Sequence, residues 1–184
     1  TARDMHAIAV KWADFAPRLH EGYPHLLAEM YAYCVAAAHL ELPHELVDSL
    51  MVSADTVGGE GWPLVDAIPD EEVCEVAMTA NHEAYPIPNL IHYCQTYKVK
   101  EWFWQKRKVP KDLFTCDKPI VQGPSPDDIT AALEGEEKSK MMLKRNAFVL
   151  CSTLNGVAEA MEYYKEMHCE GENVNMERTL KLTH

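Results

Sequence analysis

The sequence predicts a helix-rich α+β fold with few short strands. Two segments, at about residues 25–40 and 136–168, carry the three-to-four-residue apolar spacing of amphipathic helices. Between them, short apolar runs alternate with glycine and proline, as around residues 58–63. A self-sufficient α/β sheet needs strands that alternate regularly with helices, so these few strands indicate that the chain completes something larger.

An amphipathic stretch that opens at Trp12 and Phe15 is expected to precede a helix at about residues 25–40. The apolar face of this helix is marked by Leu27, Met30, Tyr31, Cys34 and Ala38. Pro43 ends this helix, because proline cannot continue a helix interior.

The middle of the chain is expected to consist of short elements and loops. The segments, in order, are a short helix or strand at 44–53 ending in Leu50, Met51 and Val52, a glycine loop at 58–63, an acidic stretch with a short helix at 69–85, a short buried strand at 89–94, and a surface loop rich in proline and aspartate at 117–130.

A long helix is expected near the C-terminus, over about residues 136–168. Its apolar stripe consists of Leu143, Ala147, Leu150, Leu154, Val157, Met161 and Tyr164. Residues 170–184 show no periodicity. The sequence therefore predicts one domain over residues 1–169, followed by a tail at 170–184.

Composition and charge narrow the class of protein. With 184 residues, of which 47% are hydrophobic and 25% charged, the chain is expected to be one globular domain. Its net charge of -12 argues against general nucleic-acid binding, since phosphates would be repelled. No apolar run approaches the roughly 18 residues of a membrane span. The start at Thr1, without a basic and apolar signal segment, is expected of a mature, processed or truncated product.

The six cysteines are compatible with up to three disulfides. Cys34 and Cys151 lie in apolar helical patterns and are equally well interpreted as buried thiols. The better disulfide candidates, near loops or element ends, are Cys74, Cys94, Cys116 and Cys169. Disulfides favour an oxidising compartment, although the pattern also permits a reducing one.

Three segments contain candidate functional residues. Glu29 precedes an apolar and aromatic helix face and is a candidate base or acceptor ligand, or else a solvated helix glutamate. The loop at 58–63 offers Glu60 and Trp62 to a sugar or phosphate, or is a plain turn. His92, in a short apolar run, is a candidate metal ligand or a hydrogen-bonded core histidine.

A cationic and aromatic cluster at residues 98–111 stands out in this acidic chain. Lys106 and Arg107 could neutralise a diphosphate, while Trp102 or Trp104 offers a ring face to a sugar or base. The alternative is that the aromatic residues belong to the core and the cations to a solvated face. No G-x-S-x-G, Walker, G-x-G-x-x-G or D-x-D motif is present.

Several of these segments, taken in order, resemble the peptidyl serine α-galactosyltransferases and the related hydroxyproline O-arabinosyltransferases of plants and algae. The resemblance covers roughly residues 5–170 and rests on YPHLLAEMYAY at 23–33, EGWP at 60–63, PNLIHYCQ at 88–95, and WFW at 102–104 with Lys106 and Pro110.

The resemblance implies the C-terminal part of a GT-A-like glycosyltransferase that works in the ER or Golgi lumen. Such enzymes use a nucleotide sugar such as a UDP-sugar, usually with Mn²⁺, and here the acceptor would be a hydroxyproline-rich peptide. Their D-x-D motif and most of their nucleotide-binding sheet lie in an N-terminal half that this chain lacks. By this resemblance His92 would complete the metal site, Glu29 would lie near the acceptor, and Lys106 or Arg107 would contact the donor diphosphate.

Two other functions remain open at this point. A non-catalytic structural or interaction subunit derived from the same family would bind neither donor nor metal, and would instead associate through an exposed apolar surface. A carbohydrate-binding module would use Trp62, Trp102 and Trp104 without a metal. A catalytic portion would need a partner segment that supplies the D-x-D motif.

Overall fold

A computed structural model describes residues 1–80, 83–134, 139–171 and 173–183. The chain separates into two units, Thr1–Leu46 and Val47–His184, where the sequence predicted one domain over 1–169. The boundary lies among residues 43–50, all of which are exposed and none of which contributes to a core. Local apolar spacing could not reveal this division, because it does not show which helix packs against which strand.

The first unit is a pair of helices, α1 (Ala2–Gly22) and α2 (Ala28–His39). The second was predicted, whereas the first begins ten residues before the amphipathic stretch expected from Trp12. Thr1 and Asp4 form a capping box that satisfies amide groups at the start of α1. The Trp12 indole donates to the Glu29 backbone oxygen at 2.7 Å and so joins the two helices.

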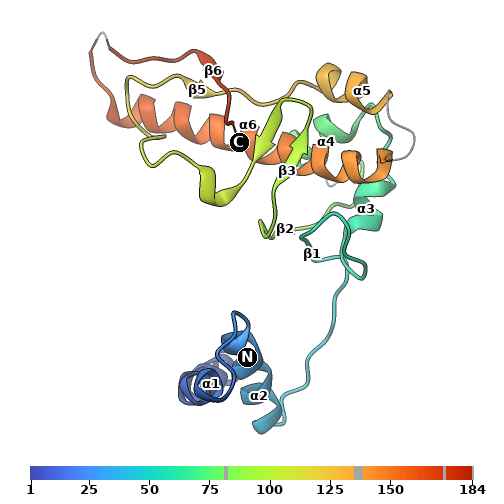
Figure 1. The fold of residues 1–184 in the computed structure, drawn as a ribbon, viewed down its shortest axis with the longest axis vertical. Helices are drawn as coiled ribbons and strands as arrows, with labels where there is room; N and C mark the ends of the chain where they lie inside the picture. Colours follow the sequence, from blue (N-terminus) through green and yellow to red (C-terminus); the bar gives the residue numbers. More distant parts are fainter. Residues whose placement is uncertain (81–82, 135–138, 172, 184) are drawn as a thin grey trace. The chain divides into compact units, whose positions relative to one another are not determined.

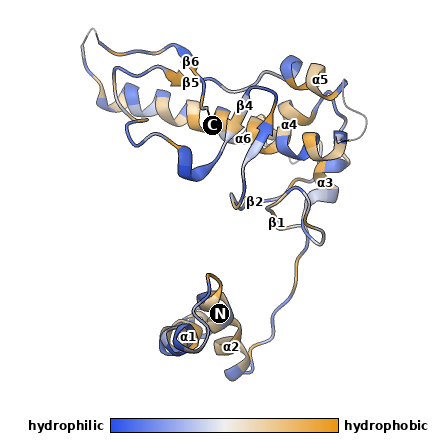
Figure 2. Ribbon diagram, in the orientation of Figure 1, coloured by the Kyte–Doolittle hydropathy of each residue, from blue (hydrophilic) through white to orange (hydrophobic). Residues whose placement is uncertain are grey.

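Small side chains form the contact between the two helices of the first unit. The buried residues of this unit are Ile8 together with Ala28, Ala32, Ala36 and Ala37. α2 is apolar over most of its length (Figure 2). Its ionisable side chains are Glu29, His39, Cys34 and two tyrosines. Its apolar residues therefore exceed what the contact with α1 covers.

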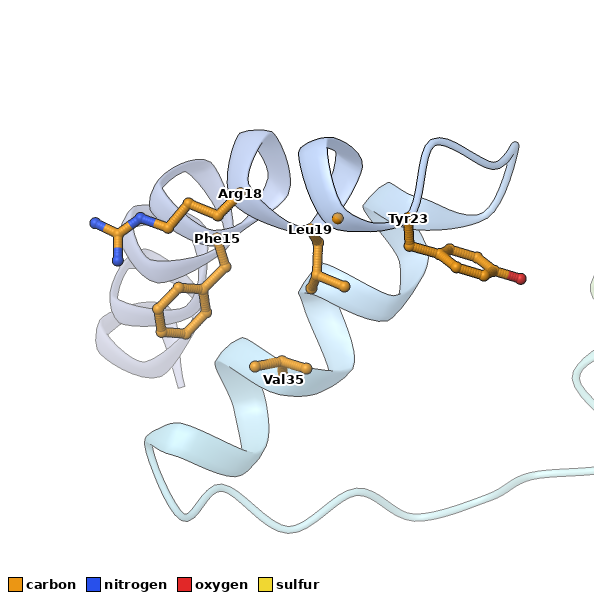
Figure 3. A pocket seen from close by; sticks show the side chains of 6 residues that line it. Phe15, Arg18, Leu19, Tyr23 and Val35 are labelled. Carbon is orange, nitrogen blue, oxygen red and sulfur yellow. The ribbon is translucent and has the colours of Figure 1, made fainter.

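An open apolar groove of about 450 Å³ lies on the first unit. Figure 3 shows Leu19 and Val35 near its middle, with Phe15 and Tyr23 at its sides and Arg18 extending away. The groove is thus lined by both helices of the unit.

The second unit is built around α6 (Lys140–His168), a helix of 29 residues (Figure 1). Its N-terminal boundary was expected at about residue 136, and residues 135–138 lie outside the described part of the chain. The other helical elements of the unit are α3 (Trp62–Asp66), α4 (Val73–Thr79), the 3-10 turn η1 (Lys106–Lys108) and α5 (Pro126–Glu134).

The described strands are short and form three separate pairs. β1 (Met51–Val52) pairs in parallel with β2 (Leu90–Ile91), and β3 (Tyr97–Val99) forms an antiparallel hairpin with β4 (Trp102–Trp104). β5 (Ile120–Val121) pairs in parallel with β6 (Arg178–Leu180). The structure therefore has a helix-rich α+β content, as predicted.

Two predictions for loops and tail are corrected by the pairing of β5 with β6. Residues 117–130 were predicted to be a surface loop, but Ile120 and Val121 are fully buried and α5 begins at Pro126. β6 lies in the predicted tail, and Leu182 beyond it is 8% exposed. The local pattern missed both features because each strand's partner lies more than 50 residues away along the chain.

The start of α5 shows how proline and aspartate were misinterpreted. Pro126 occupies the first helical turn, where its missing amide hydrogen costs nothing. The Asp128 carboxylate accepts from the Ser125 amide at 3.0 Å and from its hydroxyl at 2.7 Å. These residues are therefore helix-start signals and not loop signals.

Two disulfides tie α6 to its surroundings. Cys74–Cys151 joins α4 to the middle of α6, and Cys116–Cys169 joins the segment before β5 to the end of α6. Of the predicted candidates, Cys74, Cys116 and Cys169 are bonded, whereas Cys94 is an exposed free thiol. The interpretation of Cys34 and Cys151 as buried thiols is wrong for both residues. Cys34 is a free thiol but is exposed, and Cys151 is buried but forms a disulfide.

The oxidised cysteines bear on where the protein works. Disulfides persist in oxidising lumens and outside the cell, so the two bonds are compatible with such a location. Within the described residues, no helix combines the length and apolar character that crossing a bilayer requires.

A close contact between Gly123 and α6 yields a prediction about stability. A Cβ atom on Gly123 would lie 2.6 Å from Asn155 Oδ1, which is far inside normal contact distance. Asn155 is buried and donates to the Cys151 backbone oxygen at 2.9 Å, so it cannot easily move away. We expect Gly123→Ala to lower the free energy of unfolding by about 1–3 kcal/mol, measured by urea denaturation.

Gly156 supplies the matched control for this substitution. It lies within α6, and a Cβ added there would meet no atom within 4 Å. Gly156→Ala is expected to raise the free energy of unfolding by about 0.5–1 kcal/mol, because alanine favours the helix. Equal effects of the two substitutions would contradict the packing at Gly123.

Candidate functional site

The loops that follow β1 and β2 meet at one edge, because these two strands are parallel and in register. The carboxyl ends of parallel strands are where ligand sites form in α/β folds. Glu60 lies at the end of the first loop, and its carboxylate accepts from the Ser53 amide at 2.6 Å and from the Ser53 hydroxyl at 2.5 Å. His92 follows β2 directly.

Tyr97, in the β3–β4 hairpin, joins the loop that follows β1 to the loop that follows β2. Its hydroxyl lies 2.8 Å from the Ser53 backbone oxygen and 3.2 Å from that of His92. The side chain is fully buried, and burial raises the pKa of this phenol well above its usual range. Tyr97 is therefore a neutral donor that holds the predicted Glu60 and His92 segments against each other, a role that sequence analysis missed.

His92 does not have the surroundings predicted for it. It was placed on a short buried strand, but β2 ends at Ile91 and His92 is exposed, as is Leu90. The reason is that β2 has a single partner strand and lies at the surface. An exposed imidazole is accessible to a ligand, which a core histidine would not be.

The three tryptophans predicted to bind a sugar are all part of the core. Trp62, Trp102 and Trp104 are 1%, 5% and 7% exposed. Arg145 lies 5.3 Å from the centre of the Trp62 ring, and Lys181 lies 4.7 Å from that of Trp102. Rings covered in this way offer no open face on which a sugar could stack. The aromatic residues of the 98–111 cluster therefore belong to the core, which was the alternative interpretation.

The predicted cations and the predicted acid are at the surface. Lys106 and Arg107 are exposed on η1, directly after the buried β4. This agrees with the alternative prediction that the cations of the 98–111 cluster are solvated and its aromatic residues buried. The two cations are also accessible to an anionic ligand. Glu29 is exposed in the first turn of α2 and belongs to the first unit.

Two buried nitrogen donors near this edge have no acceptor within the part of the chain that the structure describes. They are Trp104 Nε1 and Gln95 Nε2. Tyr93, which lies between His92 and Gln95 in sequence, packs edge-on against Trp104 with ring centres 5.7 Å apart. Both nitrogen atoms are fully covered by the surrounding side chains.

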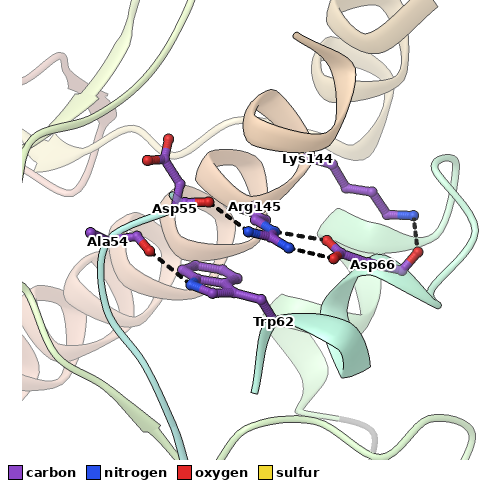
Figure 4. A network of polar contacts seen from close by, with 6 residues as sticks. All are labelled: Ala54, Asp55, Trp62, Asp66, Lys144 and Arg145. Carbon is purple, nitrogen blue, oxygen red and sulfur yellow. Dashed lines mark hydrogen bonds and ion pairs between the residues drawn. The ribbon is translucent and has the colours of Figure 1, made fainter. Parts of the chain in front are cut away.

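A second polar cluster, centred on Arg145, surrounds Trp62 (Figure 4). Arg145 on α6 binds both carboxylate oxygens of Asp66, at 2.9 and 2.6 Å, and donates to the Asp55 backbone oxygen at 2.6 Å. The Trp62 indole donates to the Ala54 backbone oxygen at 2.9 Å. This cluster fixes the start of the loop that contains Glu60.

Lys144 extends the same cluster towards the end of α3. Its ammonium group donates to the backbone oxygens of Asp66 and Ile68 and pairs with Asp70 at 3.1 Å. A hydrogen bond from Lys140, opposed by partial burial and aided by Lys144, lowers the pKa of Asp70. With each cation matched by an acid or by carbonyls, this cluster is structural.

Sequence reasoning did not find Arg145 or Asp66. The one available signal was the run Lys144, Arg145 and Asn146 beside the apolar stripe of a helix, where all three side chains turn out to be largely buried. That signal could not name the partners, which lie almost 80 residues earlier in the chain.

The described residues do not by themselves assemble a metal site. Among residues 1–80, 83–134, 139–171 and 173–183, no group of three or more His, Cys, Asp or Glu side chains is arranged to hold a metal ion. His92 fits the part of a single nitrogen ligand to Mn²⁺, while the neighbouring Glu60 carboxylate is already bonded to Ser53. The described residues therefore do not fit a complete Mn²⁺ site.

Comparison of the chain with protein-family models, with curated proteins and with solved structures finds no match.

Proposed function

We propose that this chain is the C-terminal portion of a nucleotide-sugar-dependent glycosyltransferase that adds galactose or arabinose to serine or hydroxyproline in hydroxyproline-rich glycoproteins. The observation that carries the proposal is the meeting of the Glu60 loop and the His92 loop at the carboxyl edge of β1 and β2. These are two of the segments on which the resemblance to that family rests.

Cations elsewhere in the second unit suit a nucleotide diphosphate. Lys106 and Arg107 provide exposed positive charge in an acidic protein, and they can stabilise the charge on a departing diphosphate. His92 would hold Mn²⁺ as one ligand, and a D-x-D-containing partner segment would have to supply others. By the same resemblance, Glu29 of the first unit would position the acceptor hydroxyl.

A second candidate function is a non-catalytic interaction subunit derived from the same family. The observation that favours it is the apolar outer face of α2, where Leu27, Met30, Tyr31 and Val35 are each between 44% and 56% exposed. Apolar surface of this extent marks an interaction site. The third function, a carbohydrate-binding module, loses its support because its three tryptophans are buried.

Calorimetric titration of the purified chain with UDP tests the proposed function. We expect UDP to bind at least tenfold more tightly with Mn²⁺ than without it, since His92 would help to hold the metal and the metal would neutralise diphosphate charge. His92→Ala should remove the Mn²⁺ dependence, and Arg107→Ala should weaken binding about tenfold through loss of a charge-assisted hydrogen bond.

His39→Ala is the control, because this histidine lies in the first unit, at the end of α2. Its affinity for UDP should equal that of the unmodified chain. If the chain keeps its circular dichroism spectrum and binds no UDP with or without Mn²⁺, this chain does not hold the donor and the interaction-subunit function is preferred.

A further inference from the structure

The two disulfides of the second unit differ in burial. Cys74 and Cys151, which form the inner disulfide, are 1% and 0% exposed and belong to the hydrophobic core. Cys116 and Cys169, which form the outer disulfide, are both partly exposed. Thiol–disulfide exchange begins when a thiolate reaches one sulfur atom of the bond, so its rate depends on access. A reductant can therefore reach the outer disulfide while the core stays closed.

Open space adjoins the outer disulfide. A polar groove of about 550 Å³ is lined by Asp117, which follows Cys116 in sequence, and by residues 173–177. Cys169 comes directly after His168, the exposed last residue of α6. Both ends of the bond thus have solvent close by.

The outer disulfide lies where two lightly packed segments meet. The first, named here the η1 segment, is residues 105–119, which connect β4 to β5 and of which only Leu113 is buried. The second, the C-terminal strap, is residues 173–183, of which only Leu182 is buried. Segments with few buried apolar side chains open locally at a low cost in free energy.

The backbone of Cys116 joins these two segments to each other and to α6. Its oxygen accepts from the Asn175 amide of the strap at 2.9 Å and from the Lys165 ammonium group of α6 at 3.3 Å. The same ammonium group donates to the backbone oxygens of Lys118 and Asn175. Lys165 is 1% exposed, and a charge so deeply buried needs all of these acceptors. The outer disulfide holds residue 116 beside α6, where this arrangement requires it.

The η1 segment also contains the cations of the proposed donor site. Lys106 and Arg107 lie on η1, between the buried β4 and the disulfide at residue 116. Fixing the far end of a segment reduces the conformational entropy that a ligand must remove when it binds there. Loss of the outer disulfide should therefore weaken the hold of these cations on an anion.

We propose that the outer disulfide is a redox switch: its reduction by a dithiol frees the η1 segment and the C-terminal strap, and weakens nucleotide binding at Lys106 and Arg107. The effect on nucleotide binding rests on the proposed function, whereas the release of the two segments does not.

The exchange reaction is balanced by the dithiol alone. One of its thiolates attacks a sulfur atom of the outer disulfide, which breaks the protein S–S bond and leaves a mixed disulfide. Its second thiol then displaces the protein sulfur from the mixed disulfide. Two electrons and two protons pass to the protein, so Cys116 and Cys169 become thiols and the dithiol becomes a disulfide.

Differential alkylation tests which bond is reduced, in a Cys34→Ser and Cys94→Ser background that removes the free thiols. The folded chain is treated with dithiothreitol, quenched with N-ethylmaleimide at intervals and analysed by peptide mass spectrometry. We expect the cysteines of the outer disulfide to be labelled about tenfold faster than those of the inner disulfide, or more. Equal rates, or faster labelling of the inner pair, would overturn the proposal.

Hydrogen exchange of the selectively reduced chain tests the release of the segments. The amides of Asn175, Ile120 and Gln122 bond across the two segments or between β5 and β6, and we expect about tenfold faster exchange at these positions. The amide of Val76 in α4 is the internal control, because the inner disulfide still holds that helix, and its exchange should not change. Unchanged exchange in the strap would show that its other contacts suffice, and the switch would be rejected.

Calorimetric titration with UDP and Mn²⁺ separates the switch from the proposed function. Cys116→Ser combined with Cys169→Ser reproduces the reduced state without a thiol that would bind the metal, and its dissociation constant for UDP should be roughly threefold higher. Equal affinities in the double variant and the oxidised chain would overturn the effect on nucleotide binding. If the oxidised chain binds no UDP, the proposed function fails, and the exchange of the strap amides alone decides whether the disulfide is a switch.

Discussion

Removal of the Cys74–Cys151 disulfide by the double substitution Cys74→Ala and Cys151→Ala is expected to lower the free energy of unfolding by about 4 kcal/mol. The bond joins α4 to the centre of α6 across a sequence separation of 77 residues. A cross-link over so long a loop strongly restricts the unfolded chain, which is the main origin of disulfide stabilisation in the chain-entropy description. Both sulfur atoms are also buried within the core.

Urea denaturation followed by tryptophan fluorescence measures this effect, because three of the four tryptophans lie in the second unit. Cys94→Ser is the control, since its thiol is free and exposed, and it should change the free energy of unfolding by less than about 0.5 kcal/mol. A loss below about 1 kcal/mol in the double variant would contradict the bond or its role in the fold.

The second large effect is expected from Arg145→Ala, which should lower the free energy of unfolding by about 3 kcal/mol. The side chain of Arg145 is 11% exposed, and that of its bidentate partner Asp66 is 27% exposed. Removal of one partner leaves the other carboxylate partly buried without its counter-ion, which costs far more than the pair contributes when intact. The Asp55 backbone oxygen also loses its donor.

Lys118→Ala provides the comparison for an exposed ion pair within the same unit. Lys118 pairs with Asp112, whose side chain is 58% exposed, so its removal should cost at most about 1 kcal/mol. A double-mutant cycle of Arg145→Ala with Asp66→Ala should show the two substitutions to be strongly non-additive. Additive effects would mean that the pair is not coupled in the folded protein.

The sequence predicted those features that depend on neighbours along the chain. The apolar stripe from Leu143 to Tyr164 indicated α6, and the face from Leu27 to Ala38 indicated α2, because a helix places residues three and four apart on one side. The short helix expected within 69–85 was likewise found. Of the short helix or strand expected at 44–53, only Met51–Val52 forms a strand. Helix-rich content with few strands follows from these patterns alone.

The candidate site was predicted only in part, for a related reason. Glu60, His92, Lys106 and Arg107 were recognised by residue type and by resemblance to a family, and the structure leaves all four at or near the surface. The tryptophans were not separable by sequence into core and surface, since an aromatic residue beside lysines fits both. Their burial depends on α6 and on the cations Arg145 and Lys181, which are distant in sequence.

By itself, the sequence determined the helices α2 and α6, the acidic net charge and the presence of cysteines able to form disulfides. Only the tertiary structure decided that Cys151 pairs with Cys74, that β6 covers β5, and that Tyr97 holds the Glu60 and His92 loops together. Local periodicity is a property of adjacent turns and carries no information on which distant surfaces meet. Contacts between segments distant in sequence depend on side-chain packing and on the pairing of buried polar groups, which involve the whole chain.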